Sequence, residues 1–154
     1  MSFTIRYKED LLLFRDWFRE LIRLHFSESS FWAGVKYPIE VRSHVRMLDN
    51  TEVDLMISNG KVVVIVELKE CDIQKAIEQA LKRRRFADYI YVSLDLHTYT
   101  ILKMLRNYDQ ALKAGIGIIS AKDECIVIRA YPQGRRRQRR VEKDDDRERI
   151  ELLL

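Results

Sequence analysis

Cysteine is scarce in this sequence, which holds only Cys71 and Cys125 among its 154 residues. The two are far apart, and neither has a His or Cys neighbour at the spacing of a zinc finger. The sequence therefore excludes a disulfide framework and a cysteine-ligated zinc site. We expect both residues to be buried free thiols.

Long apolar runs are also absent, since none approaches the ~20 residues that a helix needs to cross a bilayer. The N-terminus lacks the succession of basic, apolar and small residues that marks a signal peptide. We therefore expect an intracellular, cytoplasmic protein that has no membrane partner.

The residues that are present suit one domain with a genuine core, because 47% of them are hydrophobic. Charged residues make up 34%, and Asn and Gln are few, which is a balance found in proteins of thermophiles. The net charge is +4, and basic residues cluster at positions 82–85 and 135–140. Such clusters suit a polyanion, and DNA is the partner that we expect.

The stretch at residues 52–70, EVDLMISNGKVVVIVELKE, organises the rest of the chain. It predicts two strands joined by a two-residue turn at Asn59-Gly60, because both turn positions of such a hairpin need φ > 0. This turn places Ser58 opposite Lys61 and makes Asp54 the diagonal neighbour of Glu67, with roughly 7 to 8 Å between their backbones.

Alternation along the two strands then assigns Asp54, Glu67 and Lys69 to one face of the hairpin. Clustered carboxylates repel each other, and a divalent cation relieves that repulsion. Mg²⁺ takes oxygen ligands from one or two carboxylates together with waters and substrate phosphate. The sequence therefore predicts a site for Mg²⁺ or Mn²⁺ here.

Asp54, followed after twelve residues by Glu67-Leu68-Lys69, resembles the D…(D/E)xK signature of the PD-(D/E)XK nuclease superfamily, which includes restriction endonucleases and the archaeal Holliday junction resolvases. Val53 stands where the family name has proline. The setting is similar to the αβββαβ core of that family, with a helix before the hairpin and a helix and a strand after it. The resemblance spans residues 11–131.

This resemblance implies a metal-dependent endonuclease. Asp54, Glu67 and the carbonyl of Leu68 would be the metal ligands, and Lys69 would orient or deprotonate the attacking water. The family often places a further glutamate on its first helix and a glutamine on the helix after the motif. Glu20 and Gln79 match these two positions best.

Residues 7–26 have the periodicity of an amphipathic helix, with Glu20 at the edge of the apolar stripe. Glu20 either completes the metal site or is a solvated glutamate on the flank of the helix. His25 is expected at the core edge. Glu52 falls opposite Glu67 in the predicted register, and is either a spare metal ligand or a strand-entry residue in water.

A second helix is predicted from residue 73, with Asp72 as its N-cap. Lys75, Gln79 and Arg83 form an i, i+4, i+8 row that could grip a backbone phosphate or, alternatively, be a solvated basic flank.

Four further elements are predicted after this helix. Residues 89–94 read as a strand parallel to the motif strand. Residues 98–114 read as one helix, with Ile101, Leu102 and Leu105 inside and Gly115 as its C′ residue. Residues 116–120 and 126–131 read as closing strands.

The last segment, residues 132–154, has a different composition. It contains Arg135, Arg136 and Arg137, which would bind nucleic acid, then a run of acids and a terminal group of leucines. We expect these leucines to form a homodimer contact, with docking on the protein's own surface as the alternative.

We therefore predict an α/β fold with a restriction-endonuclease-like αβββαβ core, a mixed sheet flanked by helices, over residues 1–131, followed by the tail. The predicted function is divalent-metal-dependent hydrolysis of DNA phosphodiester bonds. A nucleic-acid-binding or assembly module that keeps this fold without cutting is the alternative. A metal-independent interaction protein organised around the tail is a third hypothesis.

Overall fold

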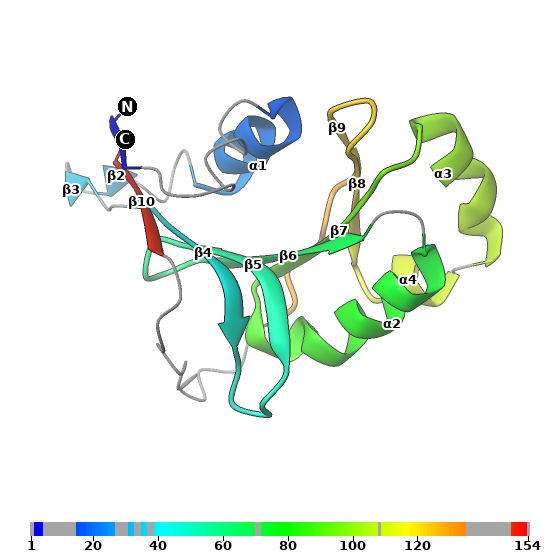
Figure 1. The fold of residues 1–154 in the computed structure, drawn as a ribbon, viewed down its shortest axis with the longest axis horizontal. Coiled ribbons are helices and arrows are strands. Elements are labelled where there is room, and N and C mark those ends of the chain that lie inside the picture. The colour runs from blue at the N-terminus through cyan, green and yellow to red at the C-terminus, as the bar shows by residue number, and fades with distance from the viewer. Residues whose placement is uncertain are drawn as a thin grey trace.

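The computed structural model describes residues 2–4, 15–26, 31–32, 35–36, 39–69, 72–107, 109–134 and 149–153, and it confirms an α/β fold with a mixed sheet flanked by helices (Figure 1). In these ranges the strands of the main sheet follow the order β1-β10-β4-β5-β6-β7-β8-β9. Strands β4, β5 and β6 are antiparallel, β6, β7 and β8 are parallel, and β9 is antiparallel to β8. Strands β2 and β3 form a separate pair.

The elements have these bounds: β1 Ser2–Thr4, α1 Asp16–Phe26, β2 Phe31–Trp32, β3 Val35–Lys36, β4 Ile39–Arg46, β5 Glu52–Ser58, β6 Val63–Lys69, α2 Ile73–Arg83, β7 Tyr89–Leu94, α3 Thr98–Met104, α4 Asp109–Lys113, β8 Gly117–Ser120, β9 Cys125–Ile128 and β10 Arg149–Leu153. Short 3₁₀ turns, η2 Arg84–Phe86 and η3 Leu105–Asn107, follow α2 and α3. None of the helices within the described ranges has the length and apolar character that a bilayer crossing requires.

Two apolar cores lie on the two faces of the sheet. Helix α1 covers one face, where Trp17 and Leu21 pack with Val64 and Val66 of β6. Helices α2, α3 and α4 lie toward the other face (Figure 1). Val63 and Ile65 of β6 belong to the core on that side. Residues 63–66 of β6 are apolar on both sides because helices cover both faces of the sheet here. The alternation along β6 directs Glu67 to the α2 face.

The predicted start of α2 and the predicted parallel strand are confirmed. Oδ1 of Asp72 accepts a hydrogen bond from the backbone N–H of Lys75 at 3.1 Å, which is an N-cap contact. Strand β7 pairs with β6 in parallel from Val64 opposite Tyr89 to Lys69 opposite Leu94. Helix α2 therefore carries the chain from the carboxyl end of β6 back to the end of the sheet at which β6 and β7 both begin.

The predicted two-residue turn is wrong. Ser58 pairs with Val63 and not with Lys61, so four residues connect β5 to β6. A type I′ turn needs φ > 0 at both central residues, but in the described residues only Gly60 of this turn has it, at 90°. Asn59 instead folds its side chain back, and Oδ1 accepts hydrogen bonds from the N–H groups of Lys61 at 3.0 Å and Val62 at 2.9 Å.

This slip of two residues preserves the predicted faces, because side chains alternate with a period of two. It changes which residues are opposite each other. The ladder ends with Leu55 opposite Val66, and beyond it Asp54 contacts β6 through the backbone N–H of Leu68. Glu52 is no longer opposite Glu67, and it pairs across β4 with Arg46.

Strand β4 changes its buried face at His44. Val41 belongs to the α1-side core, whereas Val45 belongs to the α2-side core. Between them His44 has φ of 53°, and neither His44 nor Asp54 is paired in the β4–β5 ladder, which continues in the same register from Ser43–Leu55 to Val45–Val53. A residue in the left-handed region interrupts the regular conformation of a strand. The end of the β4–β5 hairpin accordingly curls toward α2 (Figure 1).

The predicted helix at residues 98–114 is broken into α3, the 3₁₀ turn η3 and α4. Gly115 ends the unit with φ of 77°, as predicted. Ile101 and Leu105 are buried, but Leu102 is 51% exposed, so its predicted place inside the core is wrong. Leu102 follows Ile101 by one residue and is therefore turned about 100° away from it around the helix.

The chain's last described segment belongs to the sheet. Strand β10 lies between β1 and β4 and is antiparallel to both. These residues therefore dock on the chain's own sheet, which is the alternative to a homodimer contact. Residues 135–148, with Arg135, Arg136 and Arg137, lie outside the described residues. Of the two cysteines, Cys71 also lies outside them, and Cys125 is half-buried, contrary to the expected full burial.

Candidate functional site

The candidate site lies where β6 ends and the chain turns into α2. Asp54 is half-buried on β5, and its Oδ2 accepts a hydrogen bond from the backbone N–H of Leu68 at 2.8 Å. This bond ties the predicted aspartate to the strand that carries the predicted glutamate. The structure therefore places the carboxylate of Asp54 at the backbone of Leu68, the residue after Glu67.

Glu67 is 1% exposed, which is unusual for a carboxylate. Its Oε1 lies 3.1 Å from Nη1 of Arg83, the last residue of α2, whose side chain is 12% exposed. A buried carboxylate without a partner would cost several kcal/mol. The guanidinium therefore compensates the charge of Glu67 from the helix side of the sheet.

The sequence predicted Arg83 as a phosphate contact and missed its pairing with Glu67. The i, i+4, i+8 row does exist on α2, but its exposure changes along the helix. Lys75 is exposed, Gln79 is half-buried, and Arg83 is nearly buried. The signal that could have shown this is the position of Arg83 at the end of the helix that follows Glu67 and packs on its strand.

Two polar atoms near this pair are buried and have no hydrogen-bond partner among the described residues. They are Oε1 of Gln79 and Nε of Arg83, one helical turn apart on α2. An unsatisfied buried acceptor costs ~1–3 kcal/mol. Oε1 of Gln79 could accept a hydrogen bond from a bound water, and Nε of Arg83 could donate one to a substrate oxygen, so this part of α2 is a candidate for contact with a polar ligand.

The side chain of Lys69 lies outside the described part of the structure, although its backbone ends β6. The structure does not bring Glu20 to the other carboxylates. Glu20 is half-buried on α1, which packs on the face of the sheet opposite to α2 and Glu67. In the ranges that the structure describes, no three His, Cys, Asp or Glu side chains form a group that could hold a metal ion.

Glu52 and Asp49 also have partners of their own. Nδ1 of His44 lies 3.2 Å from Oε1 of Glu52. Burial works to raise the pKa of Asp49, but hydrogen bonds from Thr51 and the nearby Arg85 outweigh it, so that the pKa lies below its usual value. Asp49 is therefore a turn residue that caps its own backbone.

The basic run at residues 82–85 is partly used inside the protein. Arg83 pairs with Glu67, and Nη2 of Arg85 lies 3.1 Å from Oδ2 of Asp49. Lys82 and Arg84 are exposed. Half of this run therefore compensates carboxylates of the protein, and the other half is exposed without being assigned to them.

A buried polar pair lies on the α1 face. Nε2 of His25 lies 2.6 Å from the hydroxyl oxygen of Tyr91, and the His25 ring is 4.1 Å from that of Tyr89 between centroids. Burial, with the charge of Arg129, lowers the pKa of His25 to about 4. Burial raises the pKa of Tyr91 to about 12. His25 is thus a core-edge residue, as expected.

The sequence also missed a pair at the carboxyl end of β7. Nδ1 of His97 lies 2.8 Å from Oδ1 of Asp123, and the backbone N–H of Thr98 donates to Oδ2 of Asp123 at 2.6 Å. The hydrogen bond from His97, followed by that from Thr98, lowers the pKa of Asp123 to about 2. This carboxylate joins the β8–β9 turn to the start of α3.

Comparison of the chain with models of protein families, with curated proteins and with solved structures found no match.

Proposed function

We propose that this chain is a divalent-metal-dependent endonuclease that hydrolyses DNA phosphodiester bonds at the carboxyl end of β6. The observation that carries the proposal is the burial of Glu67, which is 1% exposed near the end of a strand that begins with four apolar residues. A well-packed apolar residue at such a position is often as stable as an ion pair or more stable. A buried carboxylate beside Asp54 therefore suits a chemical role better than a structural one.

The order of elements supports the same proposal. Helix α1 precedes the antiparallel strands β4, β5 and β6, and α2 then leads to β7, parallel to β6. This is the order that a restriction-endonuclease-like αβββαβ core requires. In that core the motif residues lie on the second and third strands, which here are β5 with Asp54 and β6 with Glu67.

The residues of the site fit a hard cation such as Mg²⁺ or Mn²⁺, which prefers oxygen ligands. Asp54 and Glu67 supply carboxylates, and Leu68 supplies a backbone carbonyl. The buried Oε1 of Gln79, which lacks a partner among the described residues, is a further acceptor for a metal-bound water. When bound, the ion would polarise the scissile phosphate and lower the pKa of the attacking water.

The chain's own residues would position these ligands. The N–H of Leu68 holds the carboxylate of Asp54, and Arg83 holds that of Glu67. In the proposal Lys69 orients or deprotonates the attacking water and offsets negative charge in the transition state. Arg83 also has a buried Nε that could donate to a phosphate oxygen, which would transfer part of its charge from Glu67 to the substrate.

A cleavage assay with and without Mg²⁺, on duplex, branched, flapped and single-stranded DNA and on RNA, tests this function. Asp54→Asn and Glu67→Gln keep the shape of each side chain and remove its charge. Each should lower metal-dependent cleavage at least ~100-fold, because a metal centre supplies several kcal/mol of transition-state stabilisation. Glu52→Gln is the matched control, since it removes a neighbouring carboxylate that pairs with His44. Full cleavage activity in either Asp54→Asn or Glu67→Gln would contradict the proposed metal centre.

A non-cleaving nucleic-acid-binding module is the second candidate, and the Glu67–Arg83 ion pair favours it. This pair already compensates the buried carboxylate from within the chain. A module of this kind would bind DNA equally well in EDTA and in Mg²⁺ and would give no heat of Mn²⁺ binding in calorimetry. The nuclease would give a heat that Asp54→Asn and Glu67→Gln remove.

A further inference from the structure

Helix α3 has an outer face that mixes exposed apolar side chains with cations. Tyr99 is 71% exposed and Leu102 is 51% exposed, and Lys103 and Arg106 are also exposed. Leu102 and Lys103 follow Tyr99 by three and four residues and therefore share one side of α3 with it, and Arg106 follows in the 3₁₀ turn η3. These four residues are here named the α3 stripe. None of these four residues is acidic. Asp95 and Asp109 are the acidic residues that flank the stripe in the sequence.

The α3 stripe begins near the carboxyl ends of β6 and β7, at the same end of the sheet as the candidate site. Glu67 is opposite Val92 in the parallel β6–β7 pair, and Lys69 is opposite Leu94, the last residue of β7. Helix α3 starts four residues later, at Thr98. A chain that crosses the carboxyl ends of β6 and β7 would therefore reach Tyr99 next.

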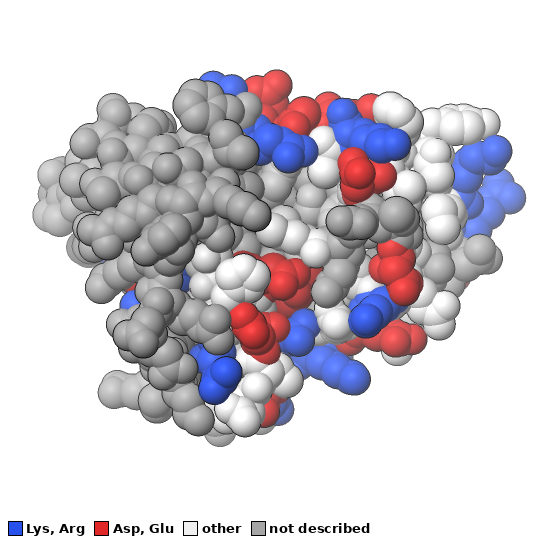
Figure 2. Space-filling model, viewed as in Figure 1, with Lys and Arg blue, Asp and Glu red and all other residues white. Residues whose placement is uncertain are grey.

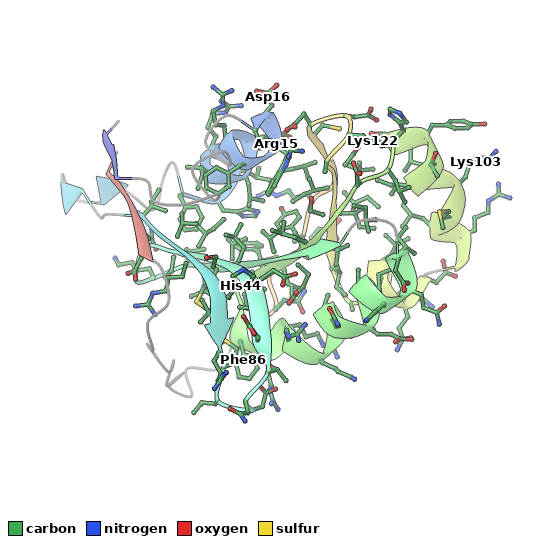
Figure 3. The ribbon with its side chains drawn as sticks, viewed as in Figure 1. Arg15, Asp16, His44, Phe86, Lys103 and Lys122 are labelled. Atoms are coloured by element: carbon green, nitrogen blue, oxygen red, sulfur yellow. The ribbon has the colours of Figure 1, made fainter. Side chains whose placement is uncertain are left out.

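The chemistry of the stripe suits an unpaired nucleic-acid strand. Nζ of Lys103 lies 5.0 Å from the centroid of the Tyr99 ring, which is a cation–π contact. Figure 3 shows Lys103 directed away from the body of the protein. In Figure 2, blue atoms of Lys or Arg lie beside white, uncharged atoms at the right-hand edge, where Figure 1 places α3. Exposed aromatic rings on which bases stack, flanked by cations that follow the backbone, are how proteins bind single strands without sequence preference.

We infer that the α3 stripe binds a single-stranded nucleic-acid segment, with a base stacked on Tyr99 and backbone phosphates at Lys103 and Arg106. This deepens the proposed function and rests on it for the choice of a nucleic acid as partner. It makes the substrate one that has a single-stranded part next to the cleaved bond, such as a flap or an overhang. Leu102 adds apolar contact for the sugar or the next base.

Binding of a fluorescent 12-nucleotide oligo(dT) in EDTA, followed by anisotropy, tests the inference without any cleavage. Tyr99→Ala should weaken binding about fivefold or more, the range given by the loss of one base–aromatic stack. Tyr99→Phe keeps the ring and should bind as the unchanged protein does. Lys103→Ala and Arg106→Ala should each flatten the plot of log K against log salt by ~0.7.

Lys61→Ala is the matched control, because it removes an exposed lysine from the turn before β6, at the opposite end of that strand from its carboxyl end. Unchanged affinity in Tyr99→Ala, or equal losses in Tyr99→Ala and Lys61→Ala, would overturn the inference. Absence of any oligo(dT) binding at low salt would also overturn it. An acidic protein would then be the alternative partner for the α3 stripe. The proposed function fails separately, if oligo(dT) binds at the stripe but no substrate is cleaved in Mg²⁺.

Discussion

Arg83 ends α2 with its Nη1 3.1 Å from Oε1 of Glu67, so a helix that follows the motif strand compensates the most buried carboxylate of the site. Two roles meet in this pair. The guanidinium stabilises the folded protein, and it occupies a carboxylate oxygen that a metal would also require. The stability of the site and its affinity for metal are therefore expected to oppose each other.

Arg83→Met should destabilise the protein by about 3–5 kcal/mol at neutral pH, because it removes the guanidinium that lies 3.1 Å from the buried carboxylate of Glu67. Urea unfolding measures this loss. Mn²⁺ should restore more of the stability in Arg83→Met than in the unchanged protein, since it would replace the missing charge. Arg84→Met, which changes the exposed neighbour, is the control and should alter stability by less than about 0.5 kcal/mol. An Arg83→Met protein as stable as this control would show that the ion pair contributes nothing.

Lys69→Ala should abolish cleavage and leave metal binding intact, because in the proposed function Lys69 acts on water and phosphate and is not a metal ligand. Calorimetric titration with Mn²⁺ separates the two properties. If Lys69→Ala loses metal binding as completely as Asp54→Asn, the lysine holds the site together and its assigned role is wrong.

Local patterns predicted most elements of the fold. The N-cap at Asp72 and the strand at residues 89–94 each depend on short-range chemistry, namely a side chain that reaches the next turn and a run of β-branched and aromatic residues. The prediction of the hairpin turn failed because Asn59 stabilises the turn with its side chain and does not adopt a positive φ. An Asn-Gly sequence permits both conformations. Since the slip was even, the paired residues 55–58 and 63–66 kept the faces that alternation assigns to them.

The candidate site was only partly predictable, because its missing parts come from tertiary packing. The sequence grouped Asp54 and Glu67 by alternation along one hairpin. It could not show that Arg83, sixteen positions later, turns inward, or that α1 carries Glu20 to the opposite face of the sheet. Helix periodicity gives the side of a helix that is buried and does not give the face of the sheet on which the helix packs.

Replacing Asn59 or Gly60 should weaken the turn that sets the register of the motif. Asn59→Ala removes the acceptor of two backbone N–H groups and should cost ~1–2 kcal/mol. Gly60 has φ of 90°, and an added Cβ would meet nothing within 4 Å, so Gly60→Ala should cost about 1 kcal/mol from backbone conformation alone. Thermal unfolding of both variants checks these values. Unchanged stability in Gly60→Ala would contradict the left-handed conformation at this residue.

The buried His25–Tyr91 pair should make stability fall in mild acid. The pKa of His25 is lowered from 6.5 to about 4 by burial and the charge of Arg129, so the unfolded chain binds a proton that the folded protein excludes. The free energy of unfolding contributed by this group is therefore complete above pH 6.5 and is lost as the pH falls toward 4, by about 3 kcal/mol in total.

Urea unfolding between pH 7 and 4 measures this effect, and His25→Gln should remove that part of the pH dependence. Among the groups that face His25 are Tyr89 and Tyr91 of β7 and Arg129 after β9. His44→Asn is the control, because Asn tolerates the φ of 53° at that exposed position. An equal pH dependence in His25→Gln and the unchanged protein would contradict the proposed origin.

The remaining basic residues are expected to bind DNA phosphates. Because Arg83 and Arg85 pair with carboxylates, the exposed Lys75 and Lys82 are the residues of α2 that remain for a duplex. Lys75→Ala should weaken binding to all sequences alike. It should also flatten the slope of log K against log salt by about 0.9, because the variant neutralises one phosphate fewer.

The arginine run at positions 135–140 requires a different design, because truncation after residue 133 removes β10 together with the run. The truncated chain should therefore be compared with a full-length variant in which only those arginines are changed to glutamine, with sedimentation reporting the oligomeric state. Weaker DNA binding by both proteins would assign the run to DNA, whereas dissociation of a dimer in the glutamine variant would assign it to a subunit interface. Unchanged salt slopes in the glutamine variant and in Lys75→Ala would show that these residues are only solvated surface.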